Sequence, residues 1–96
     1  MKTLGEIKNI LTEHKEKLRE KHKVKEIGIF GSYIRDEQKK RSDVDILVEF
    51  YEPVGWEFID LGYYLEDILG IKVDLVTPGA LREKIKDRVL REVVFL

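Results

Sequence analysis

Two groups of residues in this chain have the types and spacing to do chemistry together, and the first is a pair of aspartates. Asp43 and Asp45 are separated by one valine and lead into the apolar run 46–48. A strand over this run points both side chains to the same face, because strand side chains alternate. Two carboxylates held side by side repel each other unless a cation lies between them. The pair therefore predicts a site for Mg²⁺, which proteins bind together with substrate phosphates.

The second group is the dipeptide Gly31-Ser32, which ends another apolar run and predicts a phosphate-binding turn. Gly31 has no Cβ and lets the backbone approach a phosphate closely, while Ser32 adds a hydroxyl. Ser32 is also placed to cap a short helix over residues 33–35, whose N–H groups would face the phosphate. Arg35, one turn later, could steady the same phosphate.

A third candidate is Asp74, which stands among apolar neighbours in residues 71–76. An ionised carboxylate is costly to bury there without a partner. If the three apolar runs are neighbouring strands, all three carboxylates converge on one edge of a sheet. Each signal alone has a plainer interpretation: an ordinary turn, an exposed strand pair, or an aspartate that caps the next helix. The combination is more specific than any of its parts.

Hydrophobic periodicity predicts the elements that position these residues. Thr3 and Glu6 have capping-box spacing and begin an amphipathic helix expected to run to about His22. Thr77-Pro78 predicts the start of a last helix, with proline at its first position. Strands are expected at 24–30, 44–50 and 71–76, and further helices at 33–35 and 56–69.

The chain's last residues, 93–96, either complete the last helix or form a short edge strand. The apolar stripe of that helix is expected to bury Leu81, Ile85, Val89, Leu90 and Val93. The resulting order, α-β-α-β-α-β-α, predicts an α/β or α+β domain whose sheet is covered by helices.

Composition limits the classes of protein to consider. The 96 residues are enough for a single domain, expected over 1–96, and the net charge of −1 argues against an extended nucleic-acid surface. The chain has no cysteine, so no disulfide framework is expected. It has neither a run of the roughly 20 apolar residues that span a bilayer nor a signal peptide. A cytoplasmic protein without a membrane partner is expected.

Residues 30–35, Phe-Gly-Ser-Tyr-Ile-Arg, followed by residues 42–48, Ser-Asp-Val-Asp-Ile-Leu-Val, resemble the signature of the DNA polymerase β nucleotidyltransferase superfamily. In length and layout the chain is similar to the minimal nucleotidyltransferases (MNT), the MntA-type antitoxins of type VII-like HEPN/MNT toxin–antitoxin pairs. The resemblance covers nearly the whole chain. It implies the polymerase β-like fold, a small, mixed, twisted sheet flanked by helices.

The resemblance also implies a role for each candidate residue. Gly31 and Ser32 would hold the triphosphate of ATP, and Asp43 and Asp45 would bind two Mg²⁺ ions. Asp74 matches the third carboxylate of the family, which joins the metal site and helps to activate the attacking hydroxyl. One departure is Asp36, where many relatives have glycine; an acidic group there could weaken phosphate binding or alter the helix end.

Members resembling this chain transfer AMP from ATP to a tyrosine of the HEPN toxin, which blocks its RNase activity. The resemblance therefore implies an antitoxin that is a Mg²⁺-dependent protein adenylyltransferase, in a hetero-oligomer with its toxin, with a homodimer also possible. The size agrees, because 96 residues leave little room for domains that grip a nucleic acid or an antibiotic. The acceptor is expected to be delivered by another protein.

Two alternatives stay open. The chain could neutralise a toxin by binding alone, with an interface drawn from Trp56, Tyr63, Tyr64, Phe95 and Leu96, since aromatic anchors are enriched in interfaces. All of these except Tyr63 and Tyr64 are expected to complete the core instead. The chain could also modify a small molecule or an RNA end, held by Lys39, Lys40 and Arg41, which are otherwise expected to form a solvated loop.

Overall fold

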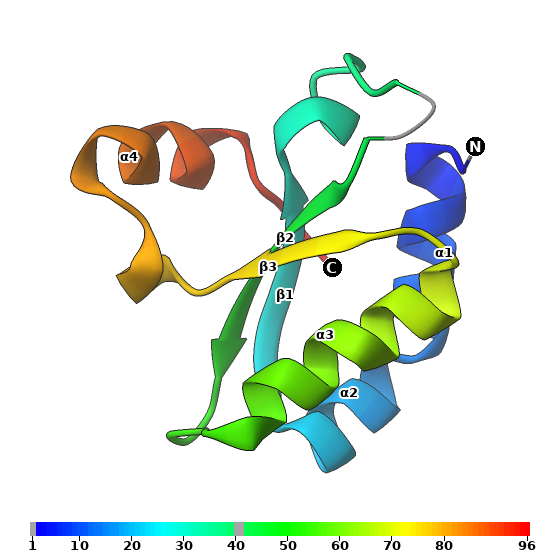
Figure 1. Cartoon of the computed structure of the whole chain (residues 1–96), viewed down its shortest axis with the longest axis vertical. Helices are drawn as coiled ribbons and strands as arrows, with labels where there is room; N and C mark the ends of the chain where they lie inside the picture. Colours follow the sequence, from blue (N-terminus) through cyan, green and yellow to red (C-terminus); the bar gives the residue numbers. More distant parts are fainter. Residues whose placement is uncertain (1, 40–41) are drawn as a thin grey trace.

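A four-stranded sheet with the strand order β3-β2-β1-β4 forms the centre of the structure (Figure 1). The computed structural model describes residues 2–39 and 42–96. β1 pairs antiparallel with β2 and with β4, whereas β2 and β3 are parallel. The mixed sheet expected from the sequence is therefore confirmed. The strands are β1 (Val24–Phe30), β2 (Val44–Phe50), β3 (Val73–Val76) and β4 (Val94–Phe95).

Local sequence signals mark the beginning of α1 and the end of α3. The capping box at Thr3 and Glu6 begins α1, and Gly70, at φ +69°, ends α3. The described helices are α1 (Leu4–Glu13), α2 (Lys15–His22), α3 (Trp56–Leu69) and α4 (Glu83–Glu92), with 3₁₀ turns η1 (Gly31–Tyr33) and η2 (Pro78–Ala80).

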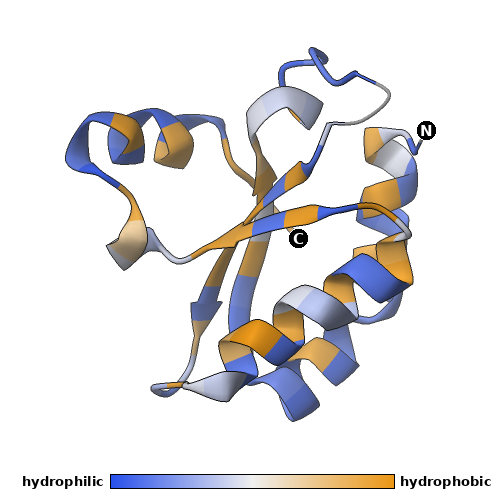
Figure 2. Ribbon diagram, viewed as in Figure 1, coloured by the Kyte–Doolittle hydropathy of each residue, from blue (hydrophilic) through white to orange (hydrophobic). Residues whose placement is uncertain are grey.

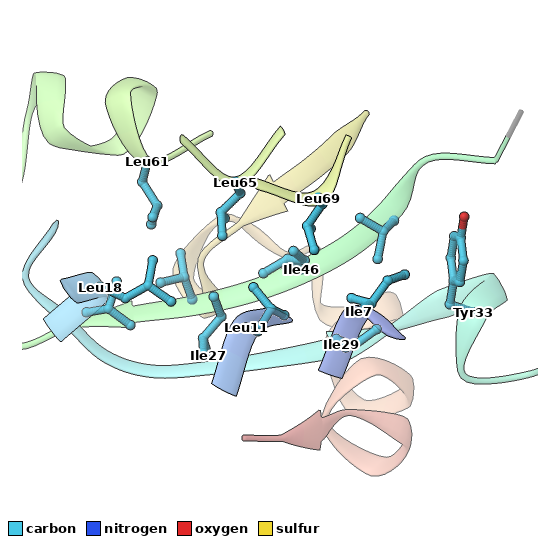
Figure 3. Packing of buried hydrophobic residues seen from close by; sticks show 13 residues of the cluster. Ile7, Leu11, Leu18, Ile27, Ile29, Tyr33, Ile46, Leu61, Leu65 and Leu69 are labelled. Carbon is cyan, nitrogen blue, oxygen red and sulfur yellow. The ribbon is translucent and has the colours of Figure 1, made fainter. Parts of the chain in front are cut away.

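The main hydrophobic core lies on one face of the sheet, beneath α1, α2 and α3. Figure 3 shows Leu61, Leu65 and Leu69 of α3 pointing toward the strands, with Leu65 and Leu69 nearest to Ile46 of β2. These leucines are fully buried, and burial of such a side chain is worth about 1.5–3 kcal/mol each. This layer of helices covers one face of β2, which is therefore apolar. The alternate side chains of the strand point to the opposite face of the sheet.

α4 is separated from α1–α3 by the strands (Figure 1). It is largely hydrophilic, whereas apolar residues gather on the parts of α1 and α3 near the strands (Figure 2). Val89 is the one residue of α4 that is buried, at 3% exposure. α4 therefore covers its side of the sheet with far less apolar contact than α1–α3 provide. No helix within residues 2–39 and 42–96 is long and apolar enough to cross a membrane.

The prediction of one helix running to His22 is wrong, because the chain bends at His14. The backbone of His14 has φ −100° and ψ 7°, and α2 starts after it. The six residues between Leu11 and Leu18 are all polar, and the chain bends within this stretch. Both leucines are 1% exposed and belong to the core on either side of the bend.

The last helix also differs from the prediction. Thr77-Pro78 begins the 3₁₀ turn η2, and α4 starts only at Glu83, because Leu81 returns to an extended conformation. Of the predicted stripe, Val89 is buried, while Ile85 and Leu90 are 49% and 45% exposed.

The chain's last residues form the edge strand β4 rather than a continuation of α4. Gly28 of β1 permits the pairing, because a Cβ there would lie 2.7 Å from Val93 Cγ2 and 3.0 Å from the carbonyl oxygen of Val94. Of the two outcomes that the sequence left open, the edge strand is confirmed.

Candidate active site

A row of residues on the sheet face opposite the main core brings the acidic candidates together. Phe30 of β1 is paired with Asp45 of β2, which in turn is paired with Asp74 of β3. Directly opposed residues in neighbouring strands point to the same face. Asp43 immediately precedes β2 and is two residues from Asp45, so it belongs to the same side of the strand.

Gly31 begins η1 directly after this row, and its backbone conformation requires glycine. Its φ is +78°, in the left-handed region that residues with a Cβ rarely adopt. A Cβ there would overlap Asp45 Oδ2 and would lie 2.9 Å from Asp45 Cγ. The space left by the missing side chain is therefore filled by the Asp45 carboxylate, a use of this glycine that the sequence did not predict.

The turn itself differs in one respect from the prediction. Ser32 lies within the 3₁₀ turn Gly31–Tyr33 and does not cap an α-helix over residues 33–35; the residue at the cap position is Phe30. Ser32 is half-buried at the same end of β1 as Gly31.

Burial and a neighbouring charge both disfavour ionisation of Asp45. Its pKa is raised to about 6, first by burial and then by the charge of Asp74 and a hydrogen bond with it. Arg35 opposes this shift, while Asp43 adds to it. Two carboxyl groups that compete in this way gain most from a proton or a cation placed between them. The chemistry of this pair thus suits a hard metal ion.

Asp43 and Asp74 are solvent-exposed, so the expectation that Asp74 carries a burial cost is wrong. It lies on β3, an edge strand of the sheet, where water reaches its side chain. Within residues 2–39 and 42–96, no group of three carboxylate or histidine side chains already has an arrangement that could hold a metal ion. The structure brings Asp45 and Asp74 together, and a metal site that includes Asp43 stays a prediction.

Arg35 is held by acidic side chains. Its Nη1 lies 3.0 Å from Glu92 Oε2, and its Nε contacts Glu37. The same Glu92 oxygen accepts a hydrogen bond of 2.6 Å from the Gly31 N–H. Glu92 is a residue of this site that sequence reasoning missed, because it comes from the end of α4 and reaches Gly31 only through the fold.

A hollow of about 180 Å³ lies beside these groups. It is lined by Asp45 and Glu92 together with Phe30, Gly31, Arg35, Ile85, Arg88 and Val89. A larger hollow of about 480 Å³ lies near Phe50, Pro53 and Pro78 and includes none of the three aspartates. The smaller hollow is the one that adjoins the candidate chemistry.

A family model described as the nucleotidyltransferase domain matches residues 11–96. The chain belongs to the nucleotidyltransferase family. Its residues 1–96 are 56% identical over 97 aligned positions to the protein adenylyltransferase MntA of Thermococcus cleftensis, with 100% of this chain and 98% of that protein covered. The family and enzyme class expected from the sequence are thereby confirmed.

Solved structures show the same nucleotidyltransferase fold. A structure described provisionally as a minimal nucleotidyltransferase has a TM-score of 0.76 and 30% identity, covering 94% of this chain and 95% of that one. A toxin–antitoxin complex crystallised with AMP-PNP contains a chain with a TM-score of 0.69 and 26% identity, covering 86% of this chain and 69% of that one.

Asp36, the one departure from the expected family pattern, has an unusual backbone conformation. Asp36 has a φ of +56°, a left-handed conformation that glycine adopts without strain and that aspartate tolerates better than most residues. Of the basic residues beyond it, Lys39 is exposed, while Lys40 and Arg41 lie outside the described residues.

Proposed function

We propose that this nucleotidyltransferase is an antitoxin that transfers AMP from ATP to a tyrosine of a HEPN-domain toxin in the cytoplasm. One observation carries the proposal: the Asp45 carboxylate lies against the Gly31 turn and beside Asp74, in a chain that matches a protein adenylyltransferase over its whole length. Carboxylates next to a phosphate-binding turn are the parts that nucleotidyl transfer needs.

The phosphate-binding side of the site is assigned to Gly31, Ser32 and Arg35. The Gly31 N–H and the Ser32 hydroxyl donate hydrogen bonds to the triphosphate, and the Arg35 guanidinium adds a positive charge that can contact two phosphate oxygens. The AMP-PNP complex of a structural relative supports a nucleoside triphosphate as the substrate.

Asp43, Asp45 and Asp74 would hold Mg²⁺. The fit rests on the raised pKa of Asp45 beside Asp74, since a divalent cation would relieve the repulsion that produces this shift. When bound, Mg²⁺ neutralises charge on the triphosphate and on the departing diphosphate.

The reaction is an in-line displacement at the α-phosphorus of ATP. The phenolic oxygen of the toxin's tyrosine forms the new P–O bond, the α–β phosphoanhydride bond breaks, and diphosphate leaves. Asp74 is exposed at the edge of the sheet, where an incoming acceptor can reach it. Its carboxylate accepts a hydrogen bond from the phenol and takes up the proton as the bond forms.

The proposal is tested by mixing the chain with the HEPN-domain protein encoded beside it, ATP and Mg²⁺, and weighing the intact toxin. The expected result is a mass increase of one or more adenylyl groups, lost in the Asp45→Asn variant. Glu49→Gln is the matched control, because Glu49 lies on the same strand, four residues from Asp45. An unmodified toxin in the presence of the native chain would contradict the proposal.

A second candidate function is neutralisation by binding alone, and the surface of α3 favours it. Trp56, Ile59 and Tyr63 are 78%, 46% and 70% exposed, so the prediction that Trp56 completes the core is wrong. These three side chains are spaced to lie along one side of the helix. An Asp43→Asn/Asp45→Asn variant that still neutralises the toxin in cells would support binding over catalysis.

A further inference from the structure

The Glu92 carboxylate occupies the place where an anion would bind at the Gly31 turn. Its Oε2 accepts a hydrogen bond of 2.6 Å from the Gly31 N–H. Its two oxygens, Oε1 and Oε2, lie 3.1 and 3.0 Å from Arg35 Nη1. Arg88 is on the other side, with its Nε 3.6 Å from Glu92 Oε1. A backbone amide and two guanidinium groups therefore surround one carboxylate, and the Glu92 side chain is only 16% exposed.

These donors are the kind that bind phosphate oxygens. Two of them, the Gly31 N–H and Arg35, are also the ones that the proposed function assigns to the triphosphate. An amide N–H carries one hydrogen and makes one good hydrogen bond, so it cannot serve Glu92 and a phosphate together. The negative charge of Glu92 would also repel a triphosphate that entered the hollow.

The position of Glu92 in α4 is unfavourable for the helix itself. It is the last residue of α4, where the helix dipole presents negative charge and disfavours another carboxylate. Three contacts hold it there together with the pairing of β4 with β1, which places the end of α4 over the turn: the hydrogen bonds from the Gly31 N–H and Arg35, and the ion pair with Arg88. Because α4 buries only Val89, little apolar contact opposes its displacement.

We propose that Glu92 is an internal competitor of the nucleotide: its carboxylate fills the phosphate subsite of the free chain, and ATP binds only after displacing it. The subsite consists of the Gly31 N–H, Arg35 and Arg88, and Arg88 becomes a ligand of the triphosphate once Glu92 leaves. This inference rests on the proposed function and adds to it a control of nucleotide affinity through α4.

Binding of ATP with Mg²⁺, measured by titration calorimetry on the whole chain, tests the proposal. If Glu92 fills the subsite in about nine molecules of ten, its neutralisation in Glu92→Gln should tighten binding about tenfold, since apparent affinity scales with the competent fraction. Glu92→Asp keeps the charge but is one methylene shorter, and it should also bind ATP more tightly. Asp87→Asn removes an equal charge from the same helix at an exposed position outside the hollow and should leave affinity unchanged.

Unchanged or weaker binding in both Glu92 variants would make Glu92 a structural contact and overturn the inference. So would a gain in Asp87→Asn equal to that in Glu92→Gln, because this would show a general effect of charge. If the native chain modifies its toxin while the Glu92 variants bind as it does, only this inference fails. If neither the native chain nor any variant binds ATP, the proposed function fails with it.

A second measurement keeps the test decisive if Glu92→Gln is poorly folded. The amide resonance of Gly31, followed by ¹H–¹⁵N NMR, should differ between the free native chain and free Glu92→Asp. At saturating ATP and Mg²⁺ the two resonances should coincide, because a phosphate then accepts from this N–H in both proteins. Resonances that stay apart would show that Glu92 remains on Gly31, which contradicts displacement.

Discussion

A double-mutant cycle on Gly31 and Asp45 tests the geometry of the site without any substrate. Gly31→Ala faces two costs in the native background. The positive φ costs a residue with a Cβ about 1–2 kcal/mol. The new Cβ also overlaps the Asp45 carboxyl group, and relieving such overpacking costs about 1–3 kcal/mol more. In an Asp45→Ala background the overlapping Oδ2 and Cγ atoms are gone, so only the conformational cost remains.

The free energy of unfolding of the four proteins, measured by urea denaturation with EDTA present, gives the result. Gly31→Ala should cost about 1–3 kcal/mol more with Asp45 present than without it, a coupling typical of residues in contact. Gly62→Ala is the control, because nothing lies within 4 Å of its added Cβ in the middle of α3. It should stabilise both backgrounds equally, by up to about 1 kcal/mol. If Gly31→Ala lowers the free energy of unfolding by the same amount with and without Asp45, to within about 0.5 kcal/mol, the contact between Gly31 and Asp45 is refuted.

Two further outcomes are expected. The pKa of Asp45 is raised to about 6, so ionisation of its carboxyl group destabilises the folded state. The contribution of the protonated group to the free energy of unfolding is complete below its unfolded-state pKa near 4, and it is lost as pH rises through 6. In metal-free buffer the native chain should therefore lose about 1–2 kcal/mol relative to Asp45→Asn between pH 4 and pH 7, less than the full shift implies because solvent screens a half-buried group; a difference independent of pH would contradict this. Gly28→Ala should cost about 1–3 kcal/mol in thermal or urea unfolding, because its Cβ would lie 2.7 Å from Val93 Cγ2, and a neutral result would contradict the close approach of β4.

The parts of the fold that sequence reasoning predicted are those governed by local pattern. The apolar run 46–48 predicted β2, and the pairing of Asp45 with Asp74 follows once β3 is parallel and adjacent to β2. The sequence also indicated that position 31 needs a residue without a Cβ. The group that occupies the free space, however, is the carboxylate of Asp45 in the same chain.

The parts that were mistaken depend on contacts between distant segments. Leu81 looks like the first apolar residue of a helix, but the chain there is still extended, and no local signal says so. Glu92 is an ordinary residue of a charged helix until the pairing of β4 with β1 places it on Gly31. Trp56 was expected in the core because it is a large aromatic residue, yet it lies at the beginning of α3 on the side of Ile59 and Tyr63, where the core does not cover it.

β2 sends alternate residues to opposite faces of the sheet. Val44, Ile46 and Val48 belong to the main core, while Asp45, between them, belongs to the site. A substitution at Asp45 can therefore alter the site without removing a side chain of the main core. A substitution at Val44, Ile46 or Val48 can likewise alter that core without removing the carboxylate. A single inserted or deleted residue has no such freedom, because it sends every later side chain of the strand to the wrong face. Natural variation in this strand should thus occur by substitution and never by a change of length.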